Sequence, residues 1–296
     1  MTPHPDRSGR TARQAFTLVE LLVVIAIIGL LIGILLPVLG RARQCAVMTG
    51  ELSSARQLLI AHRTYSHENN DQFMPGFPSA QMIQRGDVVV RDQKGDRLPS
   101  TGMPTVVAQR YPWRILPYLD YAVADWYRDK RAIESLTGTD NFAYAVSVAP
   151  RFGLNQTFVG GSADGDTGYA FNPAYETLAR RAWGANWYAR RTSDVRNPTQ
   201  QIVFASASDV DPSRRVTIDG FYRVSPPAFI ERQWRTEAPS ATTPPGETGS
   251  VSFRFAGRTV AAMVDGHAET LNFEQAQDMR RWSPQATSTD WTLKQP

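Results

Sequence analysis

Few residues of this chain have the types and spacing that catalysis requires. The strongest candidate is Asp265-Gly266-His267, because a carboxylate beside an imidazole can orient a general base. The same three residues are also typical of a tight turn, in which the glycine adopts a positive φ. Turn geometry accounts for all three residues, so we expect a turn here and no catalytic site.

The other catalytic candidates fail on spacing. His62 and His67 are five residues apart, which places them on different faces of a helix, whereas a zinc-binding helix uses histidines at i and i+4. Ser206, Ser208 and Asp209 lack the Gly-x-Ser-x-Gly sequence of a nucleophile elbow. We expect turn or surface residues at these positions, and a protein that is not an enzyme.

A metal site has one weak candidate. Asp164-Gly165-Asp166 resembles part of a calcium loop, but the bidentate glutamate that completes such a loop is missing at its required position. Calcium binding is an alternative to a plain turn at this point, and no other cofactor is expected. The single cysteine, Cys45, cannot form an internal disulfide, so the redox state of the compartment is left open.

The composition is that of an ordinary globular protein. Hydrophobic residues make up 42% and charged residues 20% of the 296 residues. The formal net charge is only +4 and the basic residues are scattered, so nucleic acid is not an expected partner. Glycine and proline lie mostly after residue 70, which predicts a loop-rich C-terminal region.

One long apolar segment decides the class of protein. Residues 21–36 contain no polar side chain, and only Thr17 and Glu20 are polar between residues 16 and 39. A helix of that length is about 36 Å long, enough to cross a hydrocarbon core of about 30 Å. A signal peptide would be shorter and would end at a small-x-small site. A plain membrane anchor leaves Glu20 unexplained, because a carboxylate in an apolar span costs free energy.

Residues 15–20, Ala-Phe-Thr-Leu-Val-Glu, resemble the processing site of type IV prepilins and of type II secretion pseudopilins. That family pattern is a small residue, the cleavage point, and then Phe-Thr-Leu-x-Glu with an apolar helix. The resemblance implies that a prepilin peptidase cuts the chain between Ala15 and Phe16, and that the new amine is methylated. Ala15 departs from the pattern, since the family usually has glycine there. Pro37 falls where the family commonly has a helix-kinking proline.

Glu20 has a physical reason to be in the span. The helix dipole favours a carboxylate in the first turn, and Glu20 could neutralise the amine of Phe16, which lowers the cost of both charges in an apolar bundle. The resemblance implies that the amine belongs to a neighbouring subunit. The alternative is that Glu20 reaches the lipid headgroups by itself.

Most of the remaining chain resembles large planctomycete-type pseudopilin-like proteins. The shared stretches are 35–43 (LLPVLGRAR), 56–65, 113–119 (WRILPYL) and Asp265-Gly266-His267. Phe255 stands where those proteins have a further histidine, and their mid-chain cysteines are missing. No role that belongs to that histidine or to those cysteines is therefore transferred to this chain.

The helix is expected to continue past Pro37 to about Tyr65 as an amphipathic segment. One stripe at spacings of three and four comprises Cys45, Met48, Leu52, Ala55 and Leu59. Arg43, Glu51, Arg56 and Gln57 lie mostly off that stripe. The stripe is predicted to pack against a sheet, with Cys45 as a small packing residue.

After residue 70 the pattern changes to short strands and turns. Strands are predicted at 88–90, 201–206, 216–224, 251–255 and 259–264. Asp265-Gly266 predicts a two-residue hairpin between 259–264 and 267–271. Residues 237–249 predict an exposed loop, and residues 111–126 a short helix or packed insertion.

Together these patterns predict an α+β protein: a long N-terminal helix, kinked at Pro37, that packs on an antiparallel β-sheet domain. The predicted parts are a cleaved leader (1–15), a transmembrane half-helix (16–39), an amphipathic half-helix (40–70) and a periplasmic β-rich domain (71–296). The predicted function is a single-pass inner-membrane pseudopilin that assembles with other pseudopilin subunits. Its further partners would be the inner-membrane components of a type II secretion system or a related envelope machine. The alternatives are a membrane-tethered periplasmic enzyme or carbohydrate-binding domain, and a type IV pilin.

Overall fold

The computed structural model describes residues 18–161, 177, 181, 187–210 and 216–292, and the structural statements below concern these residues. They belong to two compact units, Met1–Val47 and Met48–Pro296. The second unit is called the head. The fold is α+β, as predicted: a long helix is followed by antiparallel strands and short helices.

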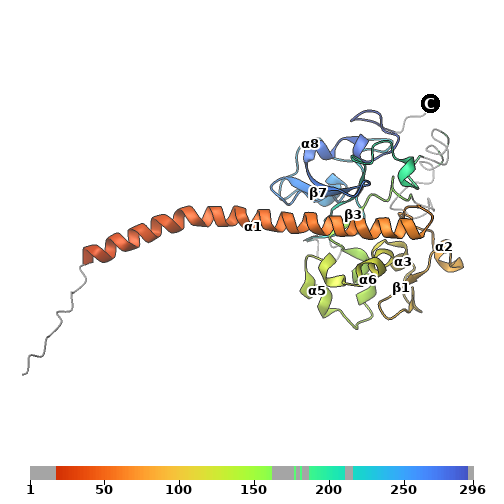
Figure 1. Cartoon of the computed structure of the whole chain (residues 1–296), viewed down its shortest axis with the longest axis horizontal. Helices are drawn as coiled ribbons and strands as arrows, with labels where there is room; N and C mark the ends of the chain where they lie inside the picture. The colour runs from red at the N-terminus through yellow and green to blue at the C-terminus, as the bar shows by residue number, and fades with distance from the viewer. Residues whose placement is uncertain (1–17, 162–176, 178–180, 182–186, 211–215, 293–296) are drawn as a thin grey trace, which may run out of the picture. The chain divides into compact units, whose positions relative to one another are not determined.

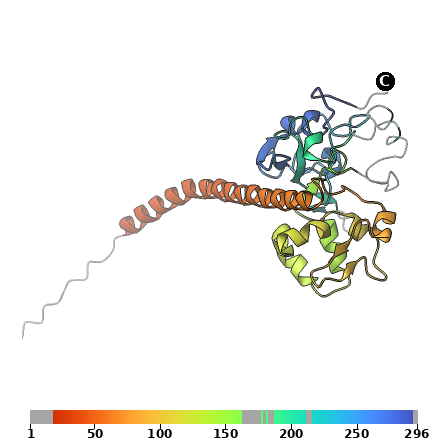
Figure 2. The same ribbon diagram turned by 45° about the vertical axis from the view of Figure 1, so that its right-hand side comes forward.

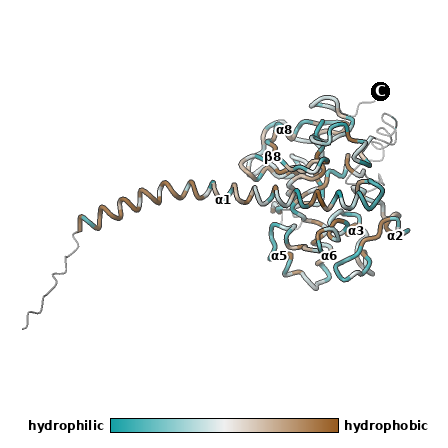
Figure 3. The backbone as a smooth tube through the Cα atoms, viewed as in Figure 1, coloured by the Kyte–Doolittle hydropathy of each residue, from teal (hydrophilic) through white to brown (hydrophobic). Residues whose placement is uncertain are grey.

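The longest element is helix α1, Leu18–Glu68, which has 51 residues. Its bounds agree with the predicted helix from near Phe16 to near Tyr65. Figure 3 shows that its N-terminal part is hydrophobic throughout, whereas its C-terminal part mixes hydrophobic and hydrophilic residues. Pro37 lies inside α1 and does not end it, so the predicted kink stays a prediction.

The centre of the head is a four-stranded antiparallel sheet in the order β3-β4-β7-β8. The strands are β3 (Phe152–Leu154), β4 (Ile202–Ser206), β7 (Arg258–Met263) and β8 (Ala268–Asn272). All five residues of β4 are buried, as expected of a strand covered on both faces. Two-stranded ribbons, β1 (Val90–Arg91) with β2 (Arg97–Leu98) and β5 (Asp209–Val210) with β6 (Thr217–Ile218), complete the strands described.

Short helices form the rest of the head. Between residues 80 and 148 they are α2 (Ala80–Arg85), α3 (Val106–Gln109), α4 (Pro112–Ile115), η1 (Leu116–Leu119), η2 (Val123–Trp126), α5 (Lys130–Ser135) and α6 (Phe142–Val148). The later ones are η4 (Thr192–Asp194), η5 (Pro245–Thr248), α8 (Phe273–Ala276) and η6 (Met279–Arg281). The predicted insertion at 111–126 is thus a run of three short helices.

Residues 48–68 of α1 lie between the sheet and the short helices of residues 80–148 (Figures 1 and 2). On the sheet side, the His62 ring lies 5.6 Å from that of Phe204 in β4. On the other side, Leu58 faces Tyr111 and Trp126. The helix is therefore part of the head's core along this length, and is covered from two directions.

Two of the predicted strands are wrong, and of the strand predicted at 88–90 only Val90 lies in a strand, β1. Only β6 forms within 216–224, because the chain turns at Gly220, whose φ is 144° and where a side chain would meet the carbonyl oxygen of Ala149. Residues 251–255 form no strand: Val251 makes an isolated bridge with Ala207, and Phe255 makes another with Arg258. Val251 and Phe255 are both buried in the core, so the apolar spacing of 251–255 reflects their burial more than continuous strand pairing.

The predicted hairpin at Asp265-Gly266 exists, but with a different turn. Ala262 pairs with Ala268, and Met263 N–H donates to the carbonyl oxygen of His267 at 2.9 Å, so the loop has three residues and not two. Gly266 has φ 102° and its N–H donates to the Met263 carbonyl at 3.0 Å. This is the usual three-residue loop, a turn followed by a glycine with positive φ, and it shifts the predicted register by one residue.

Candidate functional site

The first candidate site is the start of α1. Ala15 and Phe16, the predicted processing residues, lie outside the described residues. Glu20 lies in the first turn of α1, where the helix dipole stabilises a negative charge. Its predicted pairing with an amine stays a prediction.

The segment that follows exposes a continuous apolar surface. The large apolar side chains between residues 18 and 39 are from 44% (Val24) to 78% (Leu18) exposed. Within the described residues, α1 alone is long and apolar enough to cross a membrane. So large an apolar surface requires cover from lipid or from other protein chains.

The second candidate site is an ionic cluster where α1 enters the head. Glu51 is 1% exposed, accepts a hydrogen bond from Ser206 Oγ at 2.5 Å, and forms an ion pair with Arg254 Nη2. Arg128 Nη1 lies 3.7 Å from the second carboxylate oxygen. A buried carboxylate is tolerated when its charge is balanced and hydrogen-bonded; here two arginines balance the charge, and Oε1 accepts two hydrogen bonds.

Asp219 connects this cluster to solvent. Arg128 Nε lies 3.1 Å from one oxygen of Asp219, and Arg254 Nη1 lies 3.7 Å from the other. The Asp219 side chain is 50% exposed, so the two arginines bridge a buried and an exposed carboxylate. Arg254 also donates to the carbonyl oxygen of Ala207 at 3.0 Å. The cluster therefore joins α1 to three separate loops and to the end of β4.

The predicted stripe on α1 is correct at Ala55 and Leu59, which are buried, but it missed Glu51 and His62. The buried residues of α1 are Glu51, Ala55, Leu58, Leu59, Ala61, His62 and Ser66. Met48 and Leu52 are half-buried and pack against the core. Cys45 is exposed, so its predicted packing role is wrong; it belongs to the first unit, which ends at Val47. The available signal was the spacing of Glu51 from Ala55, Leu59 and His62, one face of a helix.

His62 is a second polar residue that α1 buries. It is 2% exposed, packs on Phe73 (ring centroids 5.4 Å apart) as well as Phe204, and its Nε2 atom makes no hydrogen bond within the described residues. Burial, together with the nearby charge of Arg114, lowers the pKa of His62 to about 4. Arg114, itself 5% exposed, donates to the carbonyl oxygens of Gly76 at 3.2 Å and Gln109 at 3.0 Å. His62 is therefore a neutral core residue at physiological pH.

We expect His62 to make the head less stable in mild acid. In the unfolded chain its pKa returns to about 6.5, so below that pH the unfolded state binds a proton that the folded state does not. The free energy of unfolding begins to fall near pH 6.5 and continues to fall until about pH 4, by about 3 kcal/mol in total. Urea unfolding of the wild type and of His62→Leu between pH 7.5 and pH 4 measures it. If the free energy of unfolding of the two proteins fell equally as the pH was lowered, His62 would not be the group responsible.

The predicted catalytic candidates do not come together. His267 Nδ1 lies 2.6 Å from Asp265 Oδ1, and the same oxygen accepts the His267 N–H at 3.1 Å, which is the geometry of a self-contained turn. Ser206 donates its hydroxyl to Glu51. His62 and His67 lie on different faces of α1, as their spacing predicts, but His62 and Ser206 are buried, so the expected surface position is wrong for these two residues.

The calcium candidate stays untested, because Asp164 and Asp166 lie outside the described residues. Among the residues that the structure does describe, no three His, Cys, Asp or Glu side chains are grouped to hold a metal ion.

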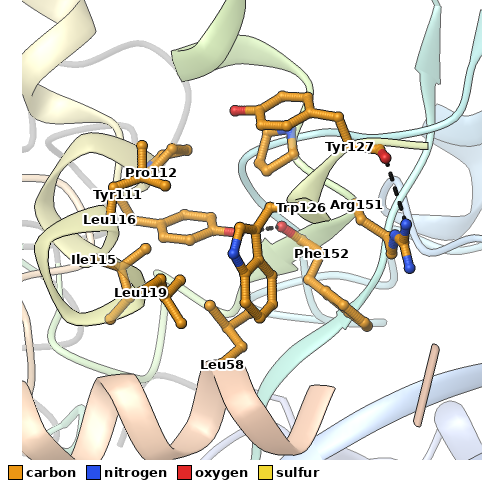
Figure 4. A pocket seen from close by; sticks show the side chains of 11 residues that line it. Leu58, Tyr111, Pro112, Ile115, Leu116, Leu119, Trp126, Tyr127, Arg151 and Phe152 are labelled. Carbon is orange, nitrogen blue, oxygen red and sulfur yellow. Dashed lines mark hydrogen bonds between the residues drawn. The ribbon is translucent and has the colours of Figure 1, made fainter. Parts of the chain in front are cut away.

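A hollow beside Leu58 is too small for a ligand (Figure 4). Its cavity volume is about 10 Å³, about the space of one water molecule. Tyr111 Oη donates to the carbonyl oxygen of Phe152 at 2.6 Å, and Arg151 Nη2 to that of Tyr127 at 3.4 Å, so these two groups have partners within the head. The hollow is a gap in the packing between α1 and the short helices.

One family model matches the chain. Residues 10–36 match the prokaryotic N-terminal methylation motif, and no match is found among curated proteins or among solved structures. The matched residues include the predicted cleavage point, Glu20 and most of the exposed apolar surface. The similarity to planctomycete-type proteins stays a prediction. The chain therefore carries a type IV prepilin-like segment at residues 10–36, at the start of a helix that is consistent with a membrane anchor.

Proposed function

We propose that the chain is a pseudopilin: a structural subunit, not an enzyme, that assembles through α1 into a periplasmic pseudopilus of a type II secretion system or a related envelope machine. One observation carries the proposal. The methylation motif continues directly into a helix whose large apolar side chains are exposed from residue 18 to residue 39, and which buries one face in a folded head between Glu51 and Ser66.

In the proposed assembly, the exposed apolar surface contacts lipid before assembly and neighbouring subunits after it. Glu20 neutralises the amine of Phe16 on a neighbour, which sets the stagger between subunits. The chain is a single-pass protein of the inner membrane with the head in the periplasm. Its partners are other pseudopilins, a prepilin peptidase and the inner-membrane components of the secretion machine.

A type IV pilin is the nearest rival, because the methylation motif is common to both kinds of subunit. The large head supports the pseudopilin, since a bulky head crowds a densely packed fibre. A membrane-tethered enzyme would use the N-terminal segment for delivery only. In that case, loss of Glu20 would leave the protein active.

The proposal predicts a mature protein that begins at Phe16 with an N-methylated amine. The expected cut lies between Ala15 and Phe16, because a small residue there precedes Phe-Thr-Leu-Val-Glu. Mass spectrometry of protein extracted from membranes measures the N-terminus. Ala15→Leu is the control, since a bulky residue at the cut should leave the precursor intact. A mature chain that keeps Met1, or that begins after Leu39, would contradict the proposal.

A further inference from the structure

A groove of about 470 Å³ lies beside the last turns of α1. Tyr65 lines it from α1, Val90 from β1 and Tyr118 from η1, and Asn69 lines it from the turn that follows α1. Its volume is within the range of about 300–1,000 Å³ that is usual for small-molecule sites. The hollow shown in Figure 4 is far smaller, so this groove is a better candidate for a binding site.

Three tyrosines give the groove an aromatic lining. The rings of Tyr65 and Tyr118 are 5.8 Å apart and nearly perpendicular, at 73°. Tyr118 Oη donates to Glu68 Oε2 at 2.8 Å, which holds its ring in place. Burial, with a further contribution from Glu68, raises the pKa of Tyr118 to about 12, so this phenol stays a donor. Tyr121, two residues beyond the end of η1, adds a third half-buried ring.

The rim of the groove carries polar groups of both kinds. Asp87 supplies a carboxylate, which accepts hydrogen bonds, and Arg91 supplies a guanidinium, which donates them. Both side chains are exposed, as is Asn69. Arg91 uses one nitrogen, Nη1, to donate to the carbonyl oxygen of Gly95 at 2.7 Å, which fixes the direction of the guanidinium. The groove thus joins apolar rings to donors and acceptors without an excess of one charge at its rim.

We propose that this groove binds a neutral oligosaccharide. A sugar ring has an apolar C–H face, which packs on an aromatic ring, and an edge of hydroxyls, each of which needs both donors and acceptors. The three tyrosines offer rings on which the C–H face can pack. Asp87, Arg91 and Asn69 offer donors and acceptors for the hydroxyls. A neutral ligand is favoured because Asp87 and Arg91 oppose each other at the rim, so a polymer of either charge meets both attraction and repulsion there. The head would then contact glycan in addition to its proposed role as a fibre subunit.

The test is isothermal titration of the full chain in lipid nanodiscs, because the usual glycoside detergents are themselves sugars. The probes are cellohexaose, xylohexaose, maltohexaose and chitohexaose, with decaproline as a competing class of ligand. We expect saturable binding of at least one oligosaccharide, weakened about tenfold by Tyr118→Ala and by Tyr121→Ala. Tyr144→Ala, an exposed tyrosine outside the groove, is the matched control and should bind like the wild type.

Asp87→Ala keeps every ring, and Asp87 is exposed, so this variant tests the rim without risk to the fold. We expect it to weaken binding as well. The proposal is overturned if no oligosaccharide binds, or if Tyr118→Ala, Tyr121→Ala and Asp87→Ala all bind as tightly as the wild type. Binding of decaproline alone, sensitive to the same tyrosines, would also overturn it and would assign the groove to a proline-rich peptide.

Discussion

Replacing Glu51 with alanine is expected to lower the free energy of unfolding of the head by about 3–5 kcal/mol. The change removes the carboxylate that faces Arg254, whose side chain is only 11% exposed, and the acceptor of the Ser206 hydroxyl. Asp219 stays 3.7 Å from Arg254, but its side chain is 50% exposed, so it offsets only part of the lost negative charge. A nearly buried guanidinium that loses its buried counter-charge is costly, because little water can reach it to replace that charge.

Urea unfolding followed by tryptophan fluorescence measures this loss. All seven tryptophans lie between residues 113 and 291, so the signal reports on the head alone. Glu134→Ala is the matched control, because Glu134 is an exposed helical glutamate and its loss should change stability by less than about 0.5 kcal/mol. The double variant Glu51→Met with Arg254→Met should recover much of the loss, since no charge is then left unpaired. A loss below about 1 kcal/mol for Glu51→Ala would contradict the assignment.

Glu20→Gln is expected to abolish contact between subunits in the membrane and to leave the head folded. If Glu20 neutralises a neighbour's amine, the glutamine variant leaves that amine unpaired in an apolar bundle, at a cost of about 3–5 kcal/mol per contact. Residue 20 lies in the first unit, so the head should melt as in the wild type. Glu20→Ala should behave like Glu20→Gln, whereas Glu20→Asp keeps the charge and should keep part of the assembly.

The measurement is crosslinking of subunits in membranes with a bifunctional maleimide. Cys45 is exposed and is the only cysteine, so each subunit offers one thiol, and Cys45→Ser gives the background. Processing at Phe16 must be equal in all variants, because an uncleaved chain has no amine to pair. If Glu20→Gln and Glu20→Ala both crosslink to the same extent as the wild type, the charge pair is excluded. That result would favour a glutamate that reaches the headgroups alone.

The sequence was most informative where the pattern is local. The apolar run, the helix through Pro37, β4 and the positive φ of Gly266 each follow from residues close together in the chain. The prepilin-like segment was found for the same reason, since its residues are consecutive. The strands predicted at 216–224 and 251–255 failed because their pairing depends on distant segments, such as the chain near Ala149 that fixes the turn at Gly220.

The ionic cluster could not be predicted in this way. Its members come from positions 51, 128, 206, 219 and 254, and only the fold brings them together. A glutamate in an amphipathic helix is ordinarily expected to face solvent, because burying its charge costs free energy. Glu51 was therefore left out of the predicted buried stripe. Arg128 and Arg254, which offset this cost, are far from Glu51 in the sequence, so no local pattern indicates them. The burial of His62 was not predicted either, because its spacing from His67 says only that the two lie on different faces.

The burial of α1 has a mechanical consequence. Its buried residues run from Glu51 to Ser66, about 22 Å of helix, and they meet the sheet on one side and the short helices on the other. A force along the axis of this segment acts on all these contacts at once, in shear, whereas a force across the axis would break them one after another. The head should therefore withstand a far greater load along α1 than across it, as a subunit that is pushed or pulled along a fibre axis requires.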